Sequence, residues 1–298
     1  MIDPRQLQAL AEVAAQTSFE RAARRLHLTQ SAISQRIRAL EAQVGQPLLV
    51  RQRPVRPTAA GARLLRYHRQ VERLTQHVLG DLALGETGVG SVALGVNADS
   101  LATWLPDALD NLLAGQHMRV ELHVDDQDVT HHLLREGRVI GCISAHAETV
   151  QSCDRVPLGI MDYVAVAAPD YVQRVFPDGV TTEALRTTMA LDFNGKDALQ
   201  STFAARHGLD PGQLQRHQVP SSEGFLELIR RGHGWGMAPA IQVAGDLQAG
   251  RLVTIAPDDV LSVPLYWHVW NITTPVIREL TEALRQAAAT ALHPLKDD

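Results

Sequence analysis

The chain has 298 residues, which is long enough for two domains that each bury a core. With 45% apolar and 20% charged residues, its composition excludes a disordered chain, and no apolar stretch approaches the ~20 residues of a bilayer-spanning helix. The N-terminus lacks the pattern of a secretory signal, so we expect a cytoplasmic protein. Cys142 and Cys153 fit that reducing compartment as small buried residues rather than as a disulfide.

The formal net charge of −5 is distributed unevenly along the chain. Residues 1–73 contain 13 arginines and five acidic residues, a net charge of +8, whereas the remaining residues carry −13. A basic N-terminal segment on an acidic body predicts that one end binds a polyanion and that the body has a different role.

Apolar residues at helical spacing predict three short helices that share one core at the N-terminus. The first helix starts near Pro4, the second is capped by Ser18, and the third is capped by Thr29. Only His27 and Leu28 separate the second helix from the third, so these two helices must cross at a steep angle. This spacing is typical of a helix-turn-helix.

The third helix carries one polar face of amides, hydroxyls and a guanidinium at positions that the core does not use. Such groups hydrogen-bond to base edges in the major groove of DNA, and a good bidentate pair gives about 1–3 kcal/mol of discrimination. A solvated helix face without function is the alternative interpretation. The residues predicted to contact DNA from this helix are Thr29, Gln30, Ser31, Ser34, Gln35 and Arg38.

A basic segment follows the third helix, which ends at Gly45, and favours the DNA-binding interpretation. Residues 48–50 form a short apolar strand, and three arginines follow without an acidic residue: Arg51, Arg53 and Arg56. Prolines among these arginines limit the conformations of the loop, which lowers the cost of holding the arginines at phosphates or in a minor groove. We therefore predict a winged helix-turn-helix DNA-binding domain over residues 1–57.

A long helix is predicted from residue 58 to residue 88, because Thr58 is a favourable N-cap and no proline follows before its end. Leu64, Val71 and Val78 repeat every seven positions, which predicts a dimerisation seam. The seam is short, so a helix packed on its own domain is the alternative. A dimer would place two reading helices on half-sites related by two-fold symmetry.

The N-terminal sequence resembles a known family. The run SFERAARRLHLTQSAISQRIRALEAQVGQPLLVR at 18–51, followed by P-T-x-x-G and a long helix, is similar to the LysR-type transcriptional regulators. Four segments of the body resemble the ArgP/LysG branch of that family: VNADSLATW at 96–104, SSEGF at 221–225, GWGMAP at 234–239 and PLYWHVW at 264–270. The wing is richer in proline than in most relatives.

The resemblance covers nearly the whole chain and implies an α/β fold. Its parts would be an N-terminal winged helix-turn-helix, a long linker helix, and a two-lobed effector domain, similar to the periplasmic binding proteins, over residues 89–298. The resemblance also implies a homodimer or homotetramer that binds double-stranded DNA. The implied effector is a basic amino acid, lysine or arginine or else histidine, and the implied targets are genes of its export or metabolism.

The body contains strand–helix units of the kind whose sheets bind ligands beyond the carboxyl ends of their strands. The first unit is expected to have a strand at 91–96 and one helix at 101–113, broken only at Pro106. We predict lobe I over 89–162 and 268–298 and lobe II over 163–267, with crossings near 162–165 and 264–268 and a final helix at 276–292. The candidate effector-binding residues are Asn97, Asp99, Ser100, Asp126, Asp128 and Ser144 in lobe I and Asp192, Asn194 and Glu223 in lobe II.

The acidic candidates suit a cationic ligand. Free N–H groups near Ser100 at a helix start can hold a ligand carboxylate, while Asp99 or Asp126 can face an ammonium or guanidinium group. The alternative is that Asp99, Ser100 and Asp128 are helix caps without contact to a ligand. If the cleft closes more tightly on one amino acid, the dimer helices and the DNA contacts shift with it.

An enzyme is the main competing class. His131 and His132 lie near Asp125, Asp126 and Asp128, but adjacent histidines point about 100° apart on a helix. The metal-binding His-x-x-x-His spacing, a phosphate loop, Cys-x-x-Cys and Gly-x-Ser-x-Gly are all missing from the sequence. We therefore predict no catalytic residue, no metal and no cofactor. A stand-alone cytoplasmic amino-acid-binding protein, or a LysR-type regulator with another effector, is the alternative function.

Overall fold

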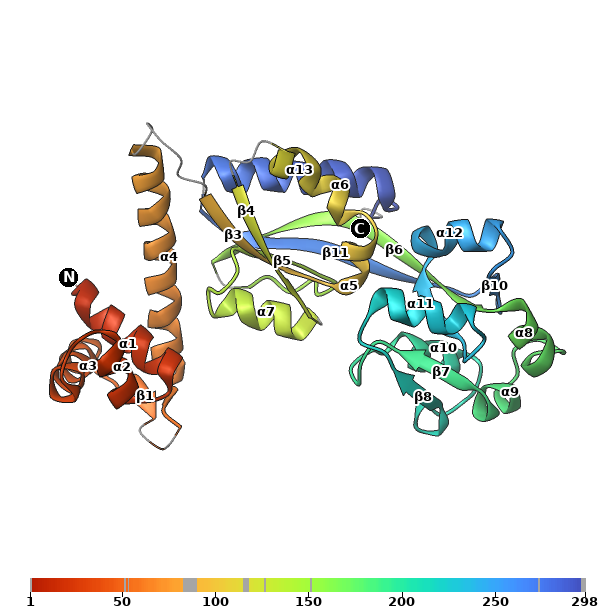
Figure 1. Cartoon of the computed structure of the whole chain (residues 1–298), viewed down its shortest axis with the longest axis horizontal. Coiled ribbons are helices and arrows are strands. Elements are labelled where there is room, and N and C mark those ends of the chain that lie inside the picture. The colour runs from red at the N-terminus through yellow and green to blue at the C-terminus, as the bar shows by residue number, and fades with distance from the viewer. Residues whose placement is uncertain are drawn as a thin grey trace. The chain divides into compact units, whose positions relative to one another are not determined.

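The computed structural model describes residues 2–50, 52, 54–82, 90–114, 118–125, 127–150, 152–272 and 274–295. The N-terminal part consists of helices and a short antiparallel pair of strands (Figure 1): α1 (Pro4–Gln16), α2 (Phe19–Arg25), α3 (Gln30–Val44), β1 (Leu49–Val50), β2 (Arg56–Pro57) and α4 (Ala59–Leu82). No helix within the described ranges is long and apolar enough to cross a membrane.

The ends of the first three helices are fixed by local side-chain and backbone chemistry. Asp3, Ser18 and Thr29 each accept a hydrogen bond from a backbone N–H in the first turn of the helix that follows. Gly45 ends α3 in the left-handed conformation, at φ 78°, where a side chain would be strained. The caps expected at Ser18 and Thr29 and the helix end expected at Gly45 are confirmed.

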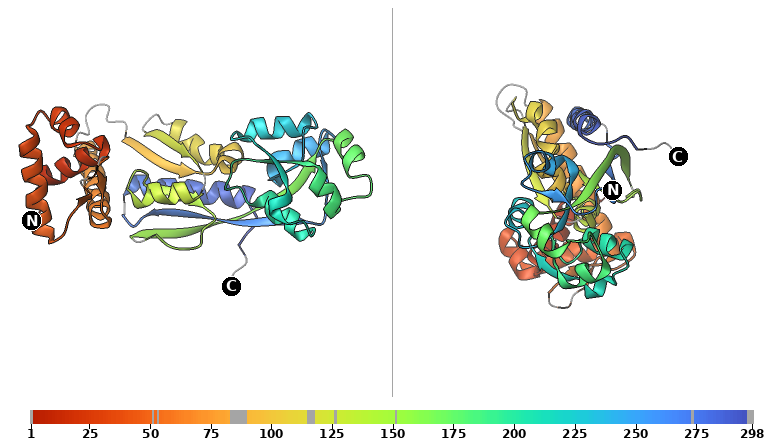
Figure 2. Two further views of the ribbon diagram at one scale, coloured as in Figure 1. Left: turned by 90° about the horizontal axis from the view of Figure 1, so that it is seen from below. Right: turned by 90° about the vertical axis from the view of Figure 1, so that its right-hand side faces the viewer.

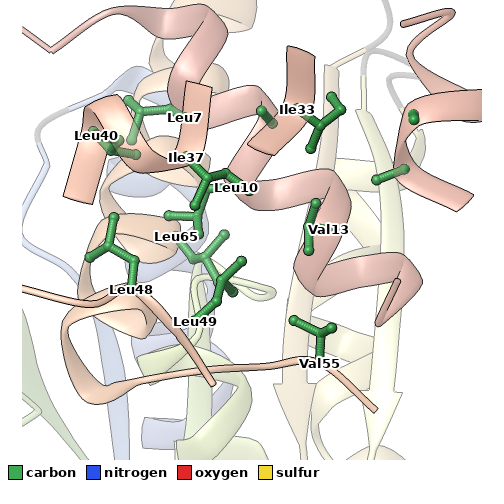
Figure 3. Packing of buried hydrophobic residues seen from close by; sticks show 13 residues of the cluster. Leu7, Leu10, Val13, Ile33, Ile37, Leu40, Leu48, Leu49, Val55 and Leu65 are labelled. Carbon is green, nitrogen blue, oxygen red and sulfur yellow. The ribbon is translucent and has the colours of Figure 1, made fainter. Parts of the chain in front are cut away.

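One hydrophobic core joins the helices of the N-terminal part (Figure 3). Leu10 and Val13 of α1 are fully buried together with Ile33 and Ile37 of α3, and Leu65 of α4 packs on the same cluster. Full burial of such a side chain stabilises the fold by about 1.5–3 kcal/mol. Because α1, α2 and α3 are short helices that would be marginal alone, this shared core stabilises them and holds their mutual angles.

The strands of the C-terminal part are β3 (Gly90–Val96), β4 (Met118–Val124), β5 (Gly141–Ser144), β6 (Cys153–Ala167), β7 (Met189–Asp192), β8 (Gln215–Gln218), β9 (Gly236–Pro239), β10 (Val253–Thr254) and β11 (Val260–Trp270). Seven of them form one sheet ordered β10–β6–β11–β5–β3–β4, in which β9 also pairs with β6. β3 and β5 are parallel, whereas β11 runs antiparallel to β5 and β6. β7 and β8 form a separate parallel pair.

The helices of this part are α5 (Ala98–Ala102), α6 (Leu105–Ala114), α7 (Gln127–Arg135), α8 (Pro169–Val175), α9 (Thr182–Thr187), α10 (Leu199–Arg206), α11 (Ser222–Arg230), α12 (Ala240–Gln248) and α13 (Pro275–Ala291), with a 3-10 turn at Pro211–Gln213. α6 and α13 lie side by side on one face of the sheet (Figure 1). The chain therefore returns with its final helix to the lobe in which the sheet begins, as expected for 276–292.

Two long strands, β6 and β11, join the two lobes of the C-terminal part. They pair antiparallel along their length, from Val260 opposite Val164 to Trp270 opposite Cys153. Figure 2 shows them running side by side between the lobes. β5 extends this pair in lobe I, whereas β9 and β10 extend it in lobe II. The crossings expected near 162–165 and 264–268 are parts of these continuous strands.

The single helix expected at 101–113 is wrong. The chain forms α5 and α6 instead, separated by Thr103 and the buried Trp104. Thr103 is the C-cap of α5, where its backbone leaves the helical conformation at φ −123° and ψ −87°, and its hydroxyl donates to the Asp99 carbonyl at 2.6 Å. Pro106 does not break a helix but lies in the first turn of α6, where its missing N–H leaves no hydrogen bond unmade.

The core of the N-terminal part predicts unequal costs for the same substitution at two valines. Val13→Ala removes two fully buried carbon atoms and should cost about 2 kcal/mol of stability, whereas Val50→Ala, at a side chain 44% exposed, should change it by less than about 0.5 kcal/mol. Hydrogen exchange of the α1 amides under mild denaturant measures this difference. Equal protection in the two variants would contradict the core described above.

Candidate nucleic-acid interface and effector site

The turn between α2 and α3 positions the exposed face of α3. The Leu26 N–H donates to the Ala22 carbonyl at 3.0 Å, and His27 then takes a left-handed conformation at φ 54°. The Leu28 N–H donates back to the Ala23 carbonyl at 2.9 Å, which closes the turn. Because the apolar face of α3 is fixed on the core, its opposite face is held toward solvent.

The DNA-contacting residues predicted on α3 lie on this solvent side. Thr29 caps the helix, and its hydroxyl lies 3.0 Å from Ser31 Oγ, so these two side chains are partly engaged with each other. Ser34 is half-buried, whereas Thr29, Gln30, Ser31, Gln35 and Arg38 are exposed. The helix therefore presents two amides and a guanidinium, which are groups that read base edges and bind phosphates.

The wing strands are tied to the helices beside them. The Val55 N–H donates to the Thr17 carbonyl at 3.1 Å, and the Leu48 N–H donates to Glu41 Oε1 at 2.9 Å. Gly61 allows α4 to start close to β1, because a Cβ at that position would clash with the Leu48 carbonyl. Arg56 is exposed on β2, which places one basic side chain on this anchored strand.

Arg51, Arg53 and Asp126 lie outside the described residues. Asp128 lies on α7 and Val78 lies on α4, but their side chains are also outside the described part of the chain.

Helix α4 has a packed face and an exposed apolar face. Leu65 is buried in the N-terminal core, whereas Tyr67 and Val71, one turn apart, are 48% and 37% exposed. Exposed apolar side chains at helical spacing fit packing against a second helix.

The carboxyl end of β3 leads into the candidate residues of lobe I. Asn97 is the N-cap of α5, yet its side chain caps nothing, and its buried Oδ1 accepts no hydrogen bond from the described residues. Asp99 and Ser100 lie inside α5 rather than at its cap, and the fully buried Ser100 Oγ also has no partner there. Ser144 ends β5 and accepts a hydrogen bond from the His146 N–H at 3.1 Å.

The carboxyl end of β7 provides the candidates of lobe II. Asp192 is only 2% exposed, and its Oδ2 lies 2.9 Å from Arg216 Nε, while its buried Oδ1 has no partner among the described residues. Arg216 also donates to Ser201 Oγ at 2.7 Å. Asn194 Oδ1 accepts a hydrogen bond from the Lys196 N–H at 2.8 Å, which uses that side chain to order the loop.

Asp99 interacts with the crossing strand β6 and with lobe II. The Tyr163 hydroxyl, from β6, donates to Asp99 Oδ2 at 2.8 Å, and the charge of Asp197, from lobe II, acts on the same carboxylate. Asp197 is held by hydrogen bonds from the Phe193 N–H at 2.9 Å and the Leu199 N–H at 3.1 Å. Its charge also acts on Asp192. The structure therefore brings Asp99 and Asp192 into one electrostatically connected group.

Burial raises the pKa values of all three acids, and the charge of Asp197 adds to the rise at Asp99 and Asp192. Desolvation raises the pKa of Asp99 to about 6, with Asp197 adding to the rise and the Tyr163 hydrogen bond opposing it. Desolvation likewise raises the pKa of Asp192 to about 6, again with Asp197 adding to it and Arg216 opposing it. The pKa of Asp197 is raised by burial. Three carboxyl groups beside one arginine leave an excess of negative charge that a bound cation would relieve.

Glu223 does not join this group. It is exposed in the first turn of α11, where it lines a cavity of about 630 Å³ with Ala102 and Arg230. Neither Asp99 nor Asp192 lines that cavity.

The candidates predicted from the sequence do not include Asp197, Tyr163 and Arg216. Asp197 follows the end of β7, so the signal that selected Asp192 could also have found it. Tyr163 sits in a largely buried strand, and Arg216 lies on the short strand β8, so neither differs in sequence from an ordinary structural residue. Among the described residues, no group of three or more His, Cys, Asp or Glu is arranged to hold a metal ion.

The raised pKa of Asp99 predicts a pH-dependent cost to stability. An acid whose pKa rises on folding destabilises the folded state above that pKa and has no effect below its unfolded value near 4. Asp99→Asn should therefore raise the Tm of the ligand-free protein by about 2–4 °C at pH 7.5 and by much less at pH 4.5. Thermal unfolding at both pH values measures this, with the exposed Asp178→Asn as control. A gain that is the same at both pH values would refute it.

Comparison with known proteins places this arrangement in a family. Residues 4–62 match the bacterial regulatory helix-turn-helix protein, lysR family, and residues 85–289 match the LysR substrate binding domain. The HTH-type transcriptional regulator ArgP of Pseudomonas fluorescens (strain Pf0-1) is 46% identical over 298 residues, which are 99% of this chain and 100% of that protein.

Solved structures give the same result. A crystal structure of ArgP from Mycobacterium tuberculosis is 38% identical, covers 99% of this chain and 100% of its own, and has a TM-score of 0.89. Full-length LysG from Corynebacterium glutamicum with bound effector Arg is 33% identical, covers 98% of this chain and 100% of its own, and has a TM-score of 0.83. The resemblance seen in the sequence is thus confirmed, and the chain belongs to the LysR family of bacterial transcriptional regulators, in its ArgP/LysG branch.

Proposed function

We propose that this LysR-type regulator senses a basic amino acid, arginine or lysine, and controls genes of the export or metabolism of that amino acid. The observation that carries the proposal is the group of interacting carboxyl groups at Asp99, Asp192 and Asp197, which spans the two lobes with an excess of negative charge. The bound arginine in the related LysG supports the same class of effector.

The cationic group of the effector would interact with Asp99, which is only partly buried and keeps its Oδ1 free of hydrogen bonds among the described residues. The unpaired Oδ1 of Asp192 offers a second acceptor from lobe II. A ligand with two cationic groups satisfies both acids and draws the lobes together, because an unpaired buried carboxylate is costly. A neutral amino acid has only its ammonium group to offer.

The DNA contacts would come from the exposed face of α3, with Gln30, Ser34 and Gln35 in the major groove and Arg38 at a base or a phosphate. Arg56, with the neighbouring arginines of the wing, would bind the backbone or a minor groove. The exposed Tyr67 and Val71 on α4 support a homodimer, which would place two copies of α3 on half-sites related by two-fold symmetry.

The proposed base reading predicts different losses for two alanine variants. Gln35→Ala should weaken binding to an operator by about 1–3 kcal/mol and leave binding to random DNA nearly unchanged, because only the operator presents the matching base edge. Arg56→Ala should weaken both and reduce the salt dependence of binding, because it removes a phosphate contact. Fluorescence anisotropy with an operator selected from a random duplex library measures both. An equal loss of Gln35→Ala on both DNAs would rule out base reading at that position.

The proposed effector class predicts selectivity for charge. Arginine and lysine should bind at least about 30-fold more tightly than citrulline, a neutral isostere of arginine, since a charge-assisted contact to a buried acid is worth roughly 2 kcal/mol or more. Calorimetry with arginine, lysine, histidine and citrulline on the full chain gives the comparison. Binding of citrulline as tight as that of arginine would end the proposal of a basic effector.

A further inference from the structure

We propose that Tyr163 is a positioning residue of the effector site, whose hydroxyl fixes Asp99 and maintains its negative charge for the cationic group of the effector. This inference rests on the proposed function and extends it to a residue of the crossing strand. Tyr163 lies on β6, where its backbone pairs with Leu261 of β11 and with Pro239 of β9. Its side chain nevertheless reaches Asp99 on α5, in lobe I.

The hydrogen bond from Tyr163 to Asp99 satisfies the buried phenol and also acts on the charge of the carboxylate. Tyr163 is only 4% exposed, so its hydroxyl needs an acceptor, and it donates to the carboxylate of Asp99 at 2.8 Å. A hydrogen bond donated to an ionised acceptor is roughly twice as strong as a neutral one. The Tyr163 hydroxyl bonds only to Oδ2 of Asp99. Because the Asp99 side chain is partly buried rather than enclosed, its Oδ1 is left for a ligand.

The surroundings of Asp99 shift the pKa of its carboxyl group in opposite directions. Asp197 in lobe II disfavours its charge by repulsion, and desolvation on α5 does the same. Tyr163 favours the charge through its hydrogen bond. Arg216 forms an ion pair with Asp192 rather than with Asp99. Among the described residues, the Tyr163 hydroxyl is thus the contact that opposes neutralisation of Asp99.

The consequence is a link between Tyr163 and the pH range of effector binding. A cationic group binds the ionised form of Asp99, and the pKa of that carboxyl is held down by the Tyr163 hydroxyl against burial and Asp197. Removing the hydroxyl lets this pKa rise, so the loss of affinity on acidification should begin at a higher pH. A purely structural role for Tyr163 would instead weaken binding by the same factor at every pH.

The test is calorimetric titration of arginine into the full chain and its Tyr163→Phe variant from pH 5.5 to pH 8. For a rise of one pKa unit at Asp99, the variant should bind arginine about fivefold more weakly at pH 6 and less than about 1.3-fold more weakly at pH 8. Tyr171→Phe is the matched control, because that tyrosine also bonds through its hydroxyl, which accepts from the Met189 N–H at 3.3 Å, but belongs to lobe II away from the acids. Its pH profile should follow the unsubstituted protein.

A second variant keeps the inference falsifiable if Tyr163→Phe folds poorly. Asp99→Asn retains an acceptor for the Tyr163 hydroxyl but cannot titrate. This variant should bind arginine more weakly, and its binding should lack the part of the pH dependence that is assigned to Asp99. The proposed positioning role of Tyr163 would be overturned by unchanged pH profiles of arginine binding in both variants. A loss of arginine affinity in Tyr163→Phe that is equal at all pH values would overturn it as well. Failure of the unsubstituted protein to bind arginine at any pH would instead overturn the proposed function.

Discussion

The antiparallel pairing of β6 with β11 is the interaction on which the C-terminal part depends. These strands run through both lobes, and each lobe adds its other strands to this shared pair. Because backbone hydrogen bonds fix the register, Tyr163 is held at one height between the lobes, opposite Leu261. A shift of one residue would turn that side chain to the opposite face of the sheet and remove it from Asp99.

In both parts of the chain, the fold determines where the charged and polar groups gather. In the N-terminal part, a fully apolar core beneath α3 leaves the polar groups on the solvent side, where a polyanion can reach them. In the C-terminal part, carboxyl groups are brought together where water is partly excluded, and the charge of Asp197 raises the pKa values of Asp99 and Asp192. The first arrangement favours affinity for a large polyanion, and the second favours a small cation.

Much of the fold could be predicted from the sequence because the relevant forces are local. A hydroxyl at Ser18 or Thr29 can bond to the next N–H groups only if a helix starts there, and Gly45 allows the left-handed turn that ends α3. The exception is the helix expected at 101–113. There α5 ends at the non-helical Thr103, and the buried Trp104 separates it from α6; burial of that side chain is a tertiary contact that residue preferences do not reveal.

Spacing along the chain is enough to predict the position of α3, the end of β3 just before Asp99, the end of β7 at Asp192, and the family of the protein. Which of the candidates interact with one another depends on tertiary contacts. The fold joins Asp99 to Tyr163, separated by 64 positions, connects Asp192 to Arg216, and leaves Glu223 at a cavity that neither of those acids lines. The reason is that hydrogen bonds and repulsion between charges depend on distance in space, which the register of β6 and β11 fixes and residue order does not.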